Sequence, residues 1–342
     1  MSGINGWLIL DKPIGLGSTD GVTAVKRALR AAGYDASKRG IKVGHGGTLD
    51  PLATGVLPIA LGEATKLAGR MLDSDKIYDF TVRFGAQTDT LDLEGKVIAT
   101  SDVRPTCAEV EAVLAQFTGP IDQVPPIYSA LKVDGERAYD RARAGEDVVL
   151  ASRRVTIHAL HSSPARGGGP FATSANGGGV APRAAADDAP STTSLKEAGG
   201  PPPPPGEELS DVTLTAHVSK GTYIRSLARD IAIALGTVGH VTMLRRTKAG
   251  PFDLAHAISL DKLAEFGQAR TLEHNLLPLR AGLDDIPALS LTPDQAGLLR
   301  QGRVLVGIAA DDGPRFATLD DSPVALVEVQ DREVRVVRGF NL

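Results

Sequence analysis

The segment from residue 163 to residue 208 constrains the fold most, because it cannot contribute to a packed core. Its 46 residues contain nine Gly and nine Pro, and such a stretch buries too little apolar surface to offset its ordering entropy. We predict a disordered loop or linker here. The flanking segments, RRVTIHAL (153–160) and DVTLTAHVSKG (211–221), alternate as half-buried strands do. They are predicted to pair as a hairpin with a long tip, which favours an insertion over a domain boundary.

The rest of the chain mixes strand patterns with helix patterns and predicts an α+β fold. With 342 residues, 42% of them apolar, the chain can build one large and one small domain. Ser18, Thr19 or Asp20 is predicted to cap a helix, and Thr106 begins a capping-box pattern before another. From about Ile286 the pattern is β-rich and ends in a predicted hairpin at 324–339. We therefore predict domains at 1–285 and 286–342.

Several classes of chemistry lack their sequence signatures. Cys107 is the only cysteine, which excludes an intramolecular disulfide and a cysteine zinc cluster. His158 and His161 are predicted to lie on opposite faces of a strand, and neither a metalloprotease motif nor a phosphate-binding loop is present. We predict no metal and no cofactor. The N-terminal WLIL is too short for a signal peptide or a membrane span, so a cytoplasmic protein is expected.

Basic residues are concentrated in one region although the formal net charge is −4. Between Lys26 and Gly47 there are six Lys and Arg residues and one acidic residue, a local balance of +5. This stretch is either a solvated surface or part of a surface for nucleic acid.

The run VGHGGTLDPLATGVLP (43–58) places one carboxylate, Asp50, in a glycine-rich loop. Glycines allow conformations and close approaches that a Cβ forbids, and Pro51 favours an extended Asp50. Such a loop can display a reactive carboxylate, but an ordinary Asx-turn has the same composition.

Six segments in a fixed order resemble the TruB family of bacterial tRNA pseudouridine synthases, over roughly residues 6–260 apart from the insertion. They read GWLILDKPIGLGSTDGVTAVKR (6–27), VGHGGTLDPLATGVLPIALGEATK (43–66), DKIYDFTVRFGAQTDTLDLEG (75–95), VPPIYSALKVDGERAYDRARAG (124–145), VSKGTYIRSLARDIA (218–232) and HVTMLRRTKAGPF (240–252). The resemblance implies a pseudouridine synthase fold, with a central mixed, mostly antiparallel sheet flanked by helices. Residues 286–342 resemble the family's small PUA-like RNA-binding module less closely, and they carry six basic and eight acidic residues.

The resemblance also implies a reaction and its residues. The family converts the uridine at position 55, in the TΨC loop of tRNA, to pseudouridine. Asp50 matches the essential aspartate and Arg225 the arginine that pairs with it. Tyr78 matches a tyrosine that packs on the target base and is a candidate for a later proton transfer. The remaining matches are to positions that bind or flip the substrate: His45, Tyr223, Leu244 and Lys12.

The residues by themselves leave alternatives open. Pseudouridine formation is a redox-neutral isomerisation, so the absence of cofactor motifs is expected. Asp50 can act as a nucleophile at the sugar or the base, or as a base that removes a sugar proton. A nearby arginine would favour the ionised carboxylate, yet by position Arg225 also fits a helix surface. Tyr78 and Tyr223 fit core positions as well, and His45 either fills the space left by a flipped base or caps the loop.

The predicted partner is the TΨC stem-loop of tRNA, bound by a monomer without an obligatory protein partner. Arg137, Arg141 and Arg143 are further candidates for phosphate contacts. Two rival functions remain: an RNA-folding helper whose chemistry is secondary, and a guide-dependent relative from ribonucleoprotein complexes.

Overall fold

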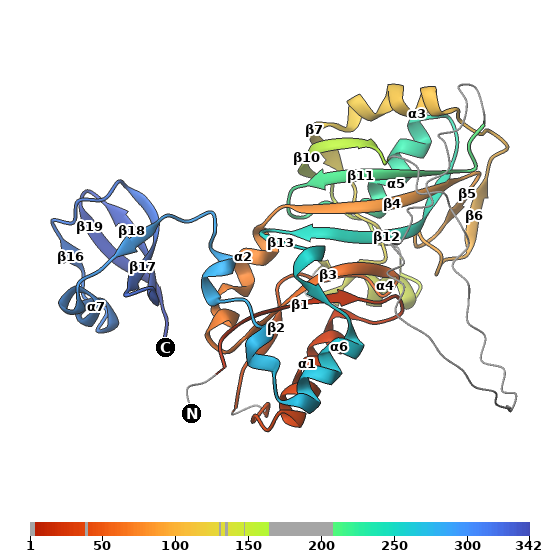
Figure 1. Cartoon of the computed structure of the whole chain (residues 1–342). Helices are drawn as coiled ribbons and strands as arrows, with labels where there is room; N and C mark the ends of the chain where they lie inside the picture. Colours follow the sequence, from red (N-terminus) through yellow and green to blue (C-terminus); the bar gives the residue numbers. More distant parts are fainter. Residues whose placement is uncertain (1–3, 38–39, 130, 134–135, 147, 164–207) are drawn as a thin grey trace, which may run out of the picture.

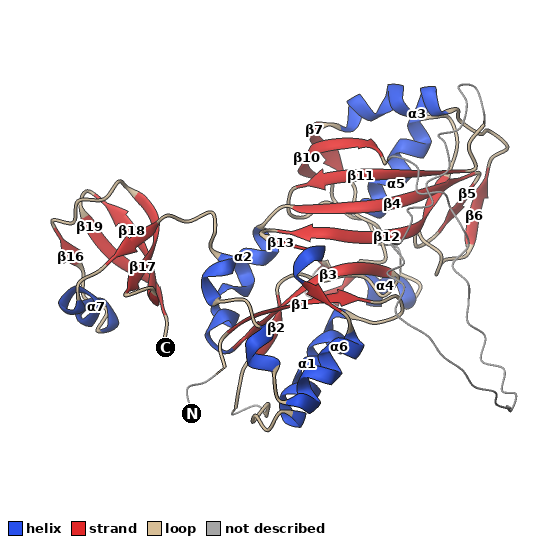
Figure 2. Cartoon of the chain, viewed as in Figure 1, coloured by secondary structure: helices blue, strands red, loops and turns tan. Residues whose placement is uncertain are grey.

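The computed structural model describes residues 4–37, 40–129, 131–133, 136–146, 148–163 and 208–342. Apart from Ser163 and Glu208, the predicted insertion lies outside the described residues. The described chain forms a ten-stranded sheet, a five-stranded sheet and two small two-stranded sheets, with helices packed around them (Figures 1 and 2). The predicted α+β class is confirmed.

The large sheet is mixed and mostly antiparallel, as predicted. Its order is β14-β1-β3-β12-β4-β11-β10-β7, with β2 beside β3 and β13 beside β12. Only β1 with β14 and β3 with β12 pair in parallel among the described strands of this sheet. The strands are β1 (Gly6–Lys12), β2 (Val43–His45), β3 (Ala53–Leu61), β4 (Lys76–Phe84), β7 (Gly119–Gln123), β10 (Arg153–Ser162), β11 (Asp211–Val218), β12 (Gly239–Ala249), β13 (Phe252–Asp253) and β14 (Ala257–Ile258).

The strands on either side of the predicted insertion pair with each other. β10 and β11 are antiparallel, and the pairing extends to Ser162 opposite Leu214. The backbone N–H of Ser163 also donates to the carbonyl of Thr213. The hairpin predicted from their alternating patterns is therefore confirmed.

Helices cover the large sheet in two groups. α1 (Ser18–Ala31) and α6 (Leu260–Ala269) pack together beside β1 and β3, and their apolar side chains share one core cluster. α5 (Ile224–Ala234) and α3 (Cys107–Leu114) bury their apolar sides against β4, β10, β11 and β12 in a second cluster. The β3–β12 pairing joins these two parts of the sheet, and the Asp50 loop lies immediately before β3.

The helix caps test two sequence predictions. Thr106 caps α3 through a reciprocal capping box with Glu109, as predicted. The cap of α1 is not Ser18, Thr19 or Asp20 but Gly17, whose N–H is accepted by the Asp20 carboxylate. That prediction was wrong because the glycine has the extended cap conformation while Asp20 satisfies it from the third helical position.

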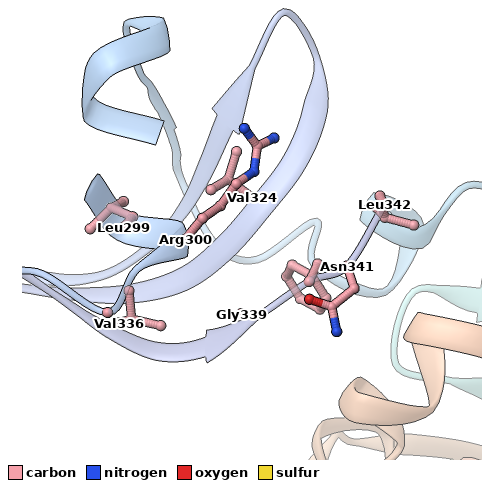
Figure 3. Close-up of a pocket in the computed structure, with 9 residues that line it drawn as sticks. Leu299, Arg300, Val324, Val336, Gly339, Asn341 and Leu342 are labelled. Atoms are coloured by element: carbon pink, nitrogen blue, oxygen red, sulfur yellow. The ribbon is translucent and has the colours of Figure 1, made fainter. Parts of the chain in front are cut away.

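The C-terminal region forms the five-stranded sheet, ordered β15-β17-β18-β19-β16. Its elements are β15 (Ala288–Ser290), α7 (Pro293–Arg300), β16 (Leu305–Val306), β17 (Gly313–Leu319), β18 (Ser322–Gln330) and β19 (Glu333–Gly339). The predicted hairpin is β18 with β19. Phe316 and Phe340 share a cluster with Trp7 of β1, and the N–H of Asn341 donates to Glu63 at 2.7 Å, so this sheet is attached to the larger one. Beside Arg300 and the last residues lies a hollow of about 440 Å³ (Figure 3).

Short elements complete the described chain: the 3₁₀ helices Gly62–Leu67, Ala115–Phe117, Leu254–His256, Leu272–Asn275 and Leu279–Gly282, together with α2 (Ala68–Asp73), β5 (Ala86–Thr88), β6 (Val97–Thr100), β8 (Lys132–Val133), β9 (Glu136–Arg137) and α4 (Ala138–Arg143). Among the helices that the structure describes, none is long and apolar enough to cross a membrane.

Candidate active site

Asp50 lies in the loop between β2 and β3, in a turn that leaves its side chain exposed. The carbonyl of Asp50 accepts the N–H of Ala53 at 3.0 Å, which closes a turn. Its side chain is nevertheless 44% exposed. Gly47 has φ +136°, and a Cβ on Gly46 would lie 2.7 Å from the Cβ of Met71. Gly47 is needed because of its positive φ, and Gly46 is needed because it lies close to α2.

The residue before Asp50 anchors the loop to α1. The buried Ser18 hydroxyl accepts the N–H of Leu49 at 2.7 Å and donates to the Leu49 carbonyl at 3.0 Å. The Leu49 side chain is 4% exposed and belongs to the core cluster of α1 and α6. Leu49, the neighbour of Asp50, is thus held through its backbone N–H, its backbone carbonyl and its side chain.

Lys12 connects the same loop to the segment between β1 and α1. The side chain is fully buried, and its ammonium donates to the carbonyls of Leu16 at 2.6 Å, Pro13 at 3.0 Å and Pro51 at 3.2 Å. Burial lowers the pKa of Lys12 from 10.5 to about 8, although the negative charge of Asp50 opposes the shift. The sequence predicted Lys12 as a substrate-binding residue. Its ammonium contacts two carbonyls of the segment between β1 and α1 and one of the Asp50 loop, and binding of substrate stays a prediction.

Arg246 of β12 holds the loop from the other side, and sequence reasoning missed it. Its guanidinium is 1% exposed and donates to the carbonyls of Val56 at 2.8 Å, Thr48 at 3.2 Å and Gly47 at 3.3 Å. These acceptors lie on both sides of Asp50 in the chain. A basic residue in an alternating strand is an ordinary observation, so only the fold identifies its role.

The pairing predicted between Arg225 and Asp50 is present. Arg225 is in the first turn of α5, and its Nη2 lies 2.9 Å from Oδ2 of Asp50. The arginine side chain is 8% exposed, which rules out the helix-surface interpretation. Nη2 also donates to the carbonyl of Tyr128 at 3.1 Å, and Nη1 donates to that of Thr90 at 2.9 Å.

A second carboxylate, Asp92, holds the far side of Arg225. Its Oδ2 lies 3.1 Å from Nη1, and its side chain is 10% exposed. Oδ1 accepts the Thr90 hydroxyl at 2.5 Å and the N–H of Glu94 at 3.0 Å. Asp92 lies inside the segment 75–95 that carries the family resemblance, but its spacing from Arg225 gave no signal. The guanidinium is therefore oriented by a buried acid and presented to an exposed one.

A small hollow of about 20 Å³ adjoins this pair. Asp50, Arg225 and Leu244 line it with Asp92, so the structure brings together three of the residues predicted from the sequence. Leu244 is fixed in register, paired with Ala53 on one side and with Phe80 on the other. The volume is that of about one water molecule, far below what a nucleobase needs.

The other predicted residues, Lys12, Tyr78, Tyr223 and His45, do not line the hollow. Tyr78 of β4 and Leu244 of β12 each pack against both core clusters. Tyr223 caps α5, its backbone bonded to Gln123, and the guanidinium of Arg153 lies 4.6 Å from its ring centroid. His45 ends β2 with a buried Nδ1 that has no hydrogen-bond partner. Burial, and less strongly the charge of Arg246, lowers the pKa of His45.

Two family models match the chain. Residues 34–167 match the TruB family pseudouridylate synthase N-terminal domain, and residues 225–284 match the tRNA pseudouridylate synthase B C-terminal domain. A protein of Novosphingobium aromaticivorans named tRNA pseudouridine synthase B is 60% identical over 99% of this chain and 98% of its own length. A protein of the same name from Zymomonas mobilis is 53% identical over 99% of this chain and 96% of its own length.

Solved structures share the fold at greater distance. One chain from the crystal structure of a Cbf5-Nop10-Gar1 complex is 22% identical, with a TM-score of 0.63, over 98% of this chain and 85% of that chain. A chain from an H/ACA RNP bound to a substrate RNA containing 2'-deoxyuridine gives a TM-score of 0.62 at 21% identity, over 98% and 85% of the two chains. These likenesses bear out the predicted fold class.

Proposed function

We propose, for a chain that belongs to the TruB family of pseudouridylate synthases, that its substrate is the uridine in the TΨC loop of tRNA. As a member of that family it is an enzyme that isomerises uridine to pseudouridine. The name shared by relatives up to 60% identical supports tRNA as the RNA class.

The observation that carries the mechanism is the exposed Asp50 carboxylate bound by a buried arginine. Arg225 contacts Oδ2 at 2.9 Å, so we assign the reaction to Oδ1. The C–N glycosidic bond breaks with its electron pair left on N1, uracil turns within the site, and C5 bonds to the sugar. The proton lost from C5 is balanced by one that N1 takes up, so the product is an isomer of uridine. Asp50 starts this sequence either as a nucleophile on the sugar or the base, or as a base toward the sugar. Each route needs a carboxylate held in place, which Arg225 and the anchored loop provide.

The target uridine must leave its RNA stack to reach Asp50. The hollow at Asp50 holds about 20 Å³, so the base enters over the exposed carboxylate as the site opens. Extrusion costs a few kcal/mol, and stacking on one aromatic ring returns about 1–3 kcal/mol. We propose that Tyr78 stacks on the target base and that Leu244 makes an apolar contact with it. We propose that His45 fills the space that the base leaves in the RNA. Tyr223, the N-cap residue of α5, is proposed to contact the substrate as well.

Exposed basic side chains of the stretch 26–47 suit the RNA backbone. Arg27, Arg30 and Lys42 of the basic stretch are exposed, while Lys38 and Arg39 lie outside the described residues. Arg141 forms an ion pair with Glu146 at 2.7 Å, Arg143 lies 4.2 Å from the ring centroid of Tyr139, and the side chain of Arg137 lies outside the described part. We assign the phosphate contacts to the basic stretch first.

We further propose that the enzyme acts in the cytoplasm as a monomer without an obligatory protein partner, on naked tRNA. The high identity to relatives named tRNA pseudouridine synthase B favours this over the guide-dependent alternative, since the chains of the Cbf5 complexes share only the fold. Residues 1–285 would form the catalytic domain, and residues 286–342 a PUA-like RNA-binding module.

Tritium release from tRNA transcribed with 5-tritiated uridine tests the reaction directly. We expect release by the purified protein without guide RNA and its loss in the Asp50→Asn variant. Asp261→Asn, an exposed carboxylate in the first turn of α6, serves as the matched control and should leave release unchanged. Release by Asp50→Asn at the normal rate would refute the assignment of Asp50. Mapping the modified nucleotide tests the TΨC position. An Asp50→Asn protein that still accelerates tRNA folding would support an additional helper role.

A further inference from the structure

Three side chains on or beside adjacent strands of the large sheet converge. They are Asp75, immediately before β4, His217 on β11 and His158 on β10. Nε2 of His158 lies 3.2 Å from Oδ2 of Asp75, and Nε2 of His217 lies 3.7 Å from the same oxygen. The two imidazole rings are 4.8 Å apart between centroids.

A β-bulge brings the histidines together. The pairing of β10 with β11 passes from Ile157 opposite Val218 to Ala159 opposite His217, so His158 is an extra residue on β10. A bulge changes the direction of a side chain and is a common device beside functional sites. The sequence prediction of no metal ligands considered His158 with His161 on the same strand. The partner is instead His217, 59 residues further along the chain.

Asp75 and the face of the sheet are equally well defined. The Asp75 carbonyl accepts the N–H of Gly250 at 3.0 Å, which holds its backbone against the end of β12. His217 is paired with Ile77, and Tyr78, the next residue, points to the opposite face of β4. The cluster is therefore on the face of β4 that does not carry Tyr78.

Two of the three ligand-atom separations are close to those of a metal-ligand set. Three oxygen or nitrogen atoms bound at about 2.0–2.2 Å to a tetrahedral Zn²⁺ lie about 3.3–3.6 Å from one another. The two distances to Asp75 bracket that range, and all three ligand atoms lie within 4.8 Å of each other. The side chains are 37% to 48% exposed, which leaves a path for an ion and a water. Imidazole and carboxylate together suit Zn²⁺ and its neighbours in the first transition row.

We propose that Asp75, His158 and His217 form a binding site for a divalent transition-metal ion, with Zn²⁺ as the typical occupant and water as the fourth ligand. The bound ion joins the ends of β4, β11 and β10. Its role is structural and is independent of the proposed reaction at Asp50. Binding only to the folded chain stabilises that chain.

The test is metal titration of metal-stripped, tag-free protein. Competition with a chromophoric chelator should give one Zn²⁺ site per chain, and Co²⁺ should develop the intense visible absorption of a four-coordinate complex. His158→Ala and His217→Ala should each weaken binding by at least about the tenfold that loss of an outer-shell partner costs. At the same concentration, Zn²⁺ should raise the Tm of the wild type more than that of either variant.

Two matched controls separate the site from ordinary surface histidines. His161→Ala removes another exposed histidine of β10, and His256→Ala removes the imidazole of an exposed pair whose Nδ1 lies 2.8 Å from Asp253. Both should bind Zn²⁺ as the wild type does. Absence of saturable Zn²⁺ binding, or equal affinity in the wild type and the His158→Ala and His217→Ala variants, would overturn the proposal and leave a plain histidine–aspartate contact. Asp75→Asn provides the same comparison if a histidine variant fails to fold.

Discussion

Arg225 is shared between two carboxylates with different exposure, and this predicts that the two acids differ in what they contribute. Asp92 is 10% exposed and faces Nη1, whereas Asp50 is 44% exposed and faces Nη2. The informative perturbations are Asp92→Asn and Asp50→Asn, because each keeps the shape of the side chain and removes its charge.

The magnitudes follow from burial. Removing one partner of a buried ion pair costs about 3–5 kcal/mol when the other charge is left uncompensated. In Asp92→Asn the guanidinium keeps Asp50 and the carbonyls of Thr90 and Tyr128, so we expect a loss of about 2–3 kcal/mol in the free energy of unfolding. An exposed pair is worth about 0–1 kcal/mol, so Asp50→Asn should lose less than about 1 kcal/mol.

Activity should follow the reverse order. Asp50→Asn removes the reacting group and should abolish tritium release. Asp92→Asn leaves that group but loosens the arginine that positions it, so we expect a decrease of about 10- to 100-fold. Urea unfolding monitored by circular dichroism gives the stabilities, and tritium release gives the rates. The reasoning is refuted if Asp50→Asn is destabilised as much as Asp92→Asn, or if Asp92→Asn has normal activity.

Three further predictions concern the support of the Asp50 loop. Arg246→Met removes the buried donor of three carbonyls, and an unsatisfied buried group costs about 1–3 kcal/mol. We expect the free energy of unfolding to fall by at least about 2 kcal/mol, and kcat to fall while tRNA affinity stays normal. An unchanged kcat would contradict this prediction. The pKa of Lys12 is about 8 in the folded chain and 10.5 as its ordinary value, so the unfolded chain binds more protons in between and stability rises with pH. Between pH 7.5 and 9.5 the free energy of unfolding of the wild type should rise by about 2 kcal/mol relative to that of Lys12→Met. A constant difference in urea unfolding would disprove this linkage. Gly46→Ala places a Cβ 2.7 Å from that of Met71. Urea denaturation should show a loss of about 1–3 kcal/mol in the free energy of unfolding, and tritium release should show lower activity. Full stability of the variant would count against the close approach.

Local patterns located several of the elements, among them β10, β11, α3 and the C-terminal hairpin of β18 with β19. Alternation identified β10 and β11, and the capping box of Thr106 with Glu109 located the start of α3. These signals are readable because strand faces and helix caps depend on residues within a few positions of each other. The start of α1 was misplaced by a residue or more because a glycine cap carries no side-chain signal.

The sequence by itself determined the family, the loop that displays Asp50 and the identity of Arg225 as its partner, through motifs that can be compared segment by segment. Only the tertiary structure decided what surrounds them. Asp92 meets Arg225 across 133 residues, and Arg246 reaches Gly47 across 199. His158 meets His217 through a bulge. Such contacts depend on the order and register of strands in the sheet, which are set by the packing of the whole core and not by any local stretch of residues.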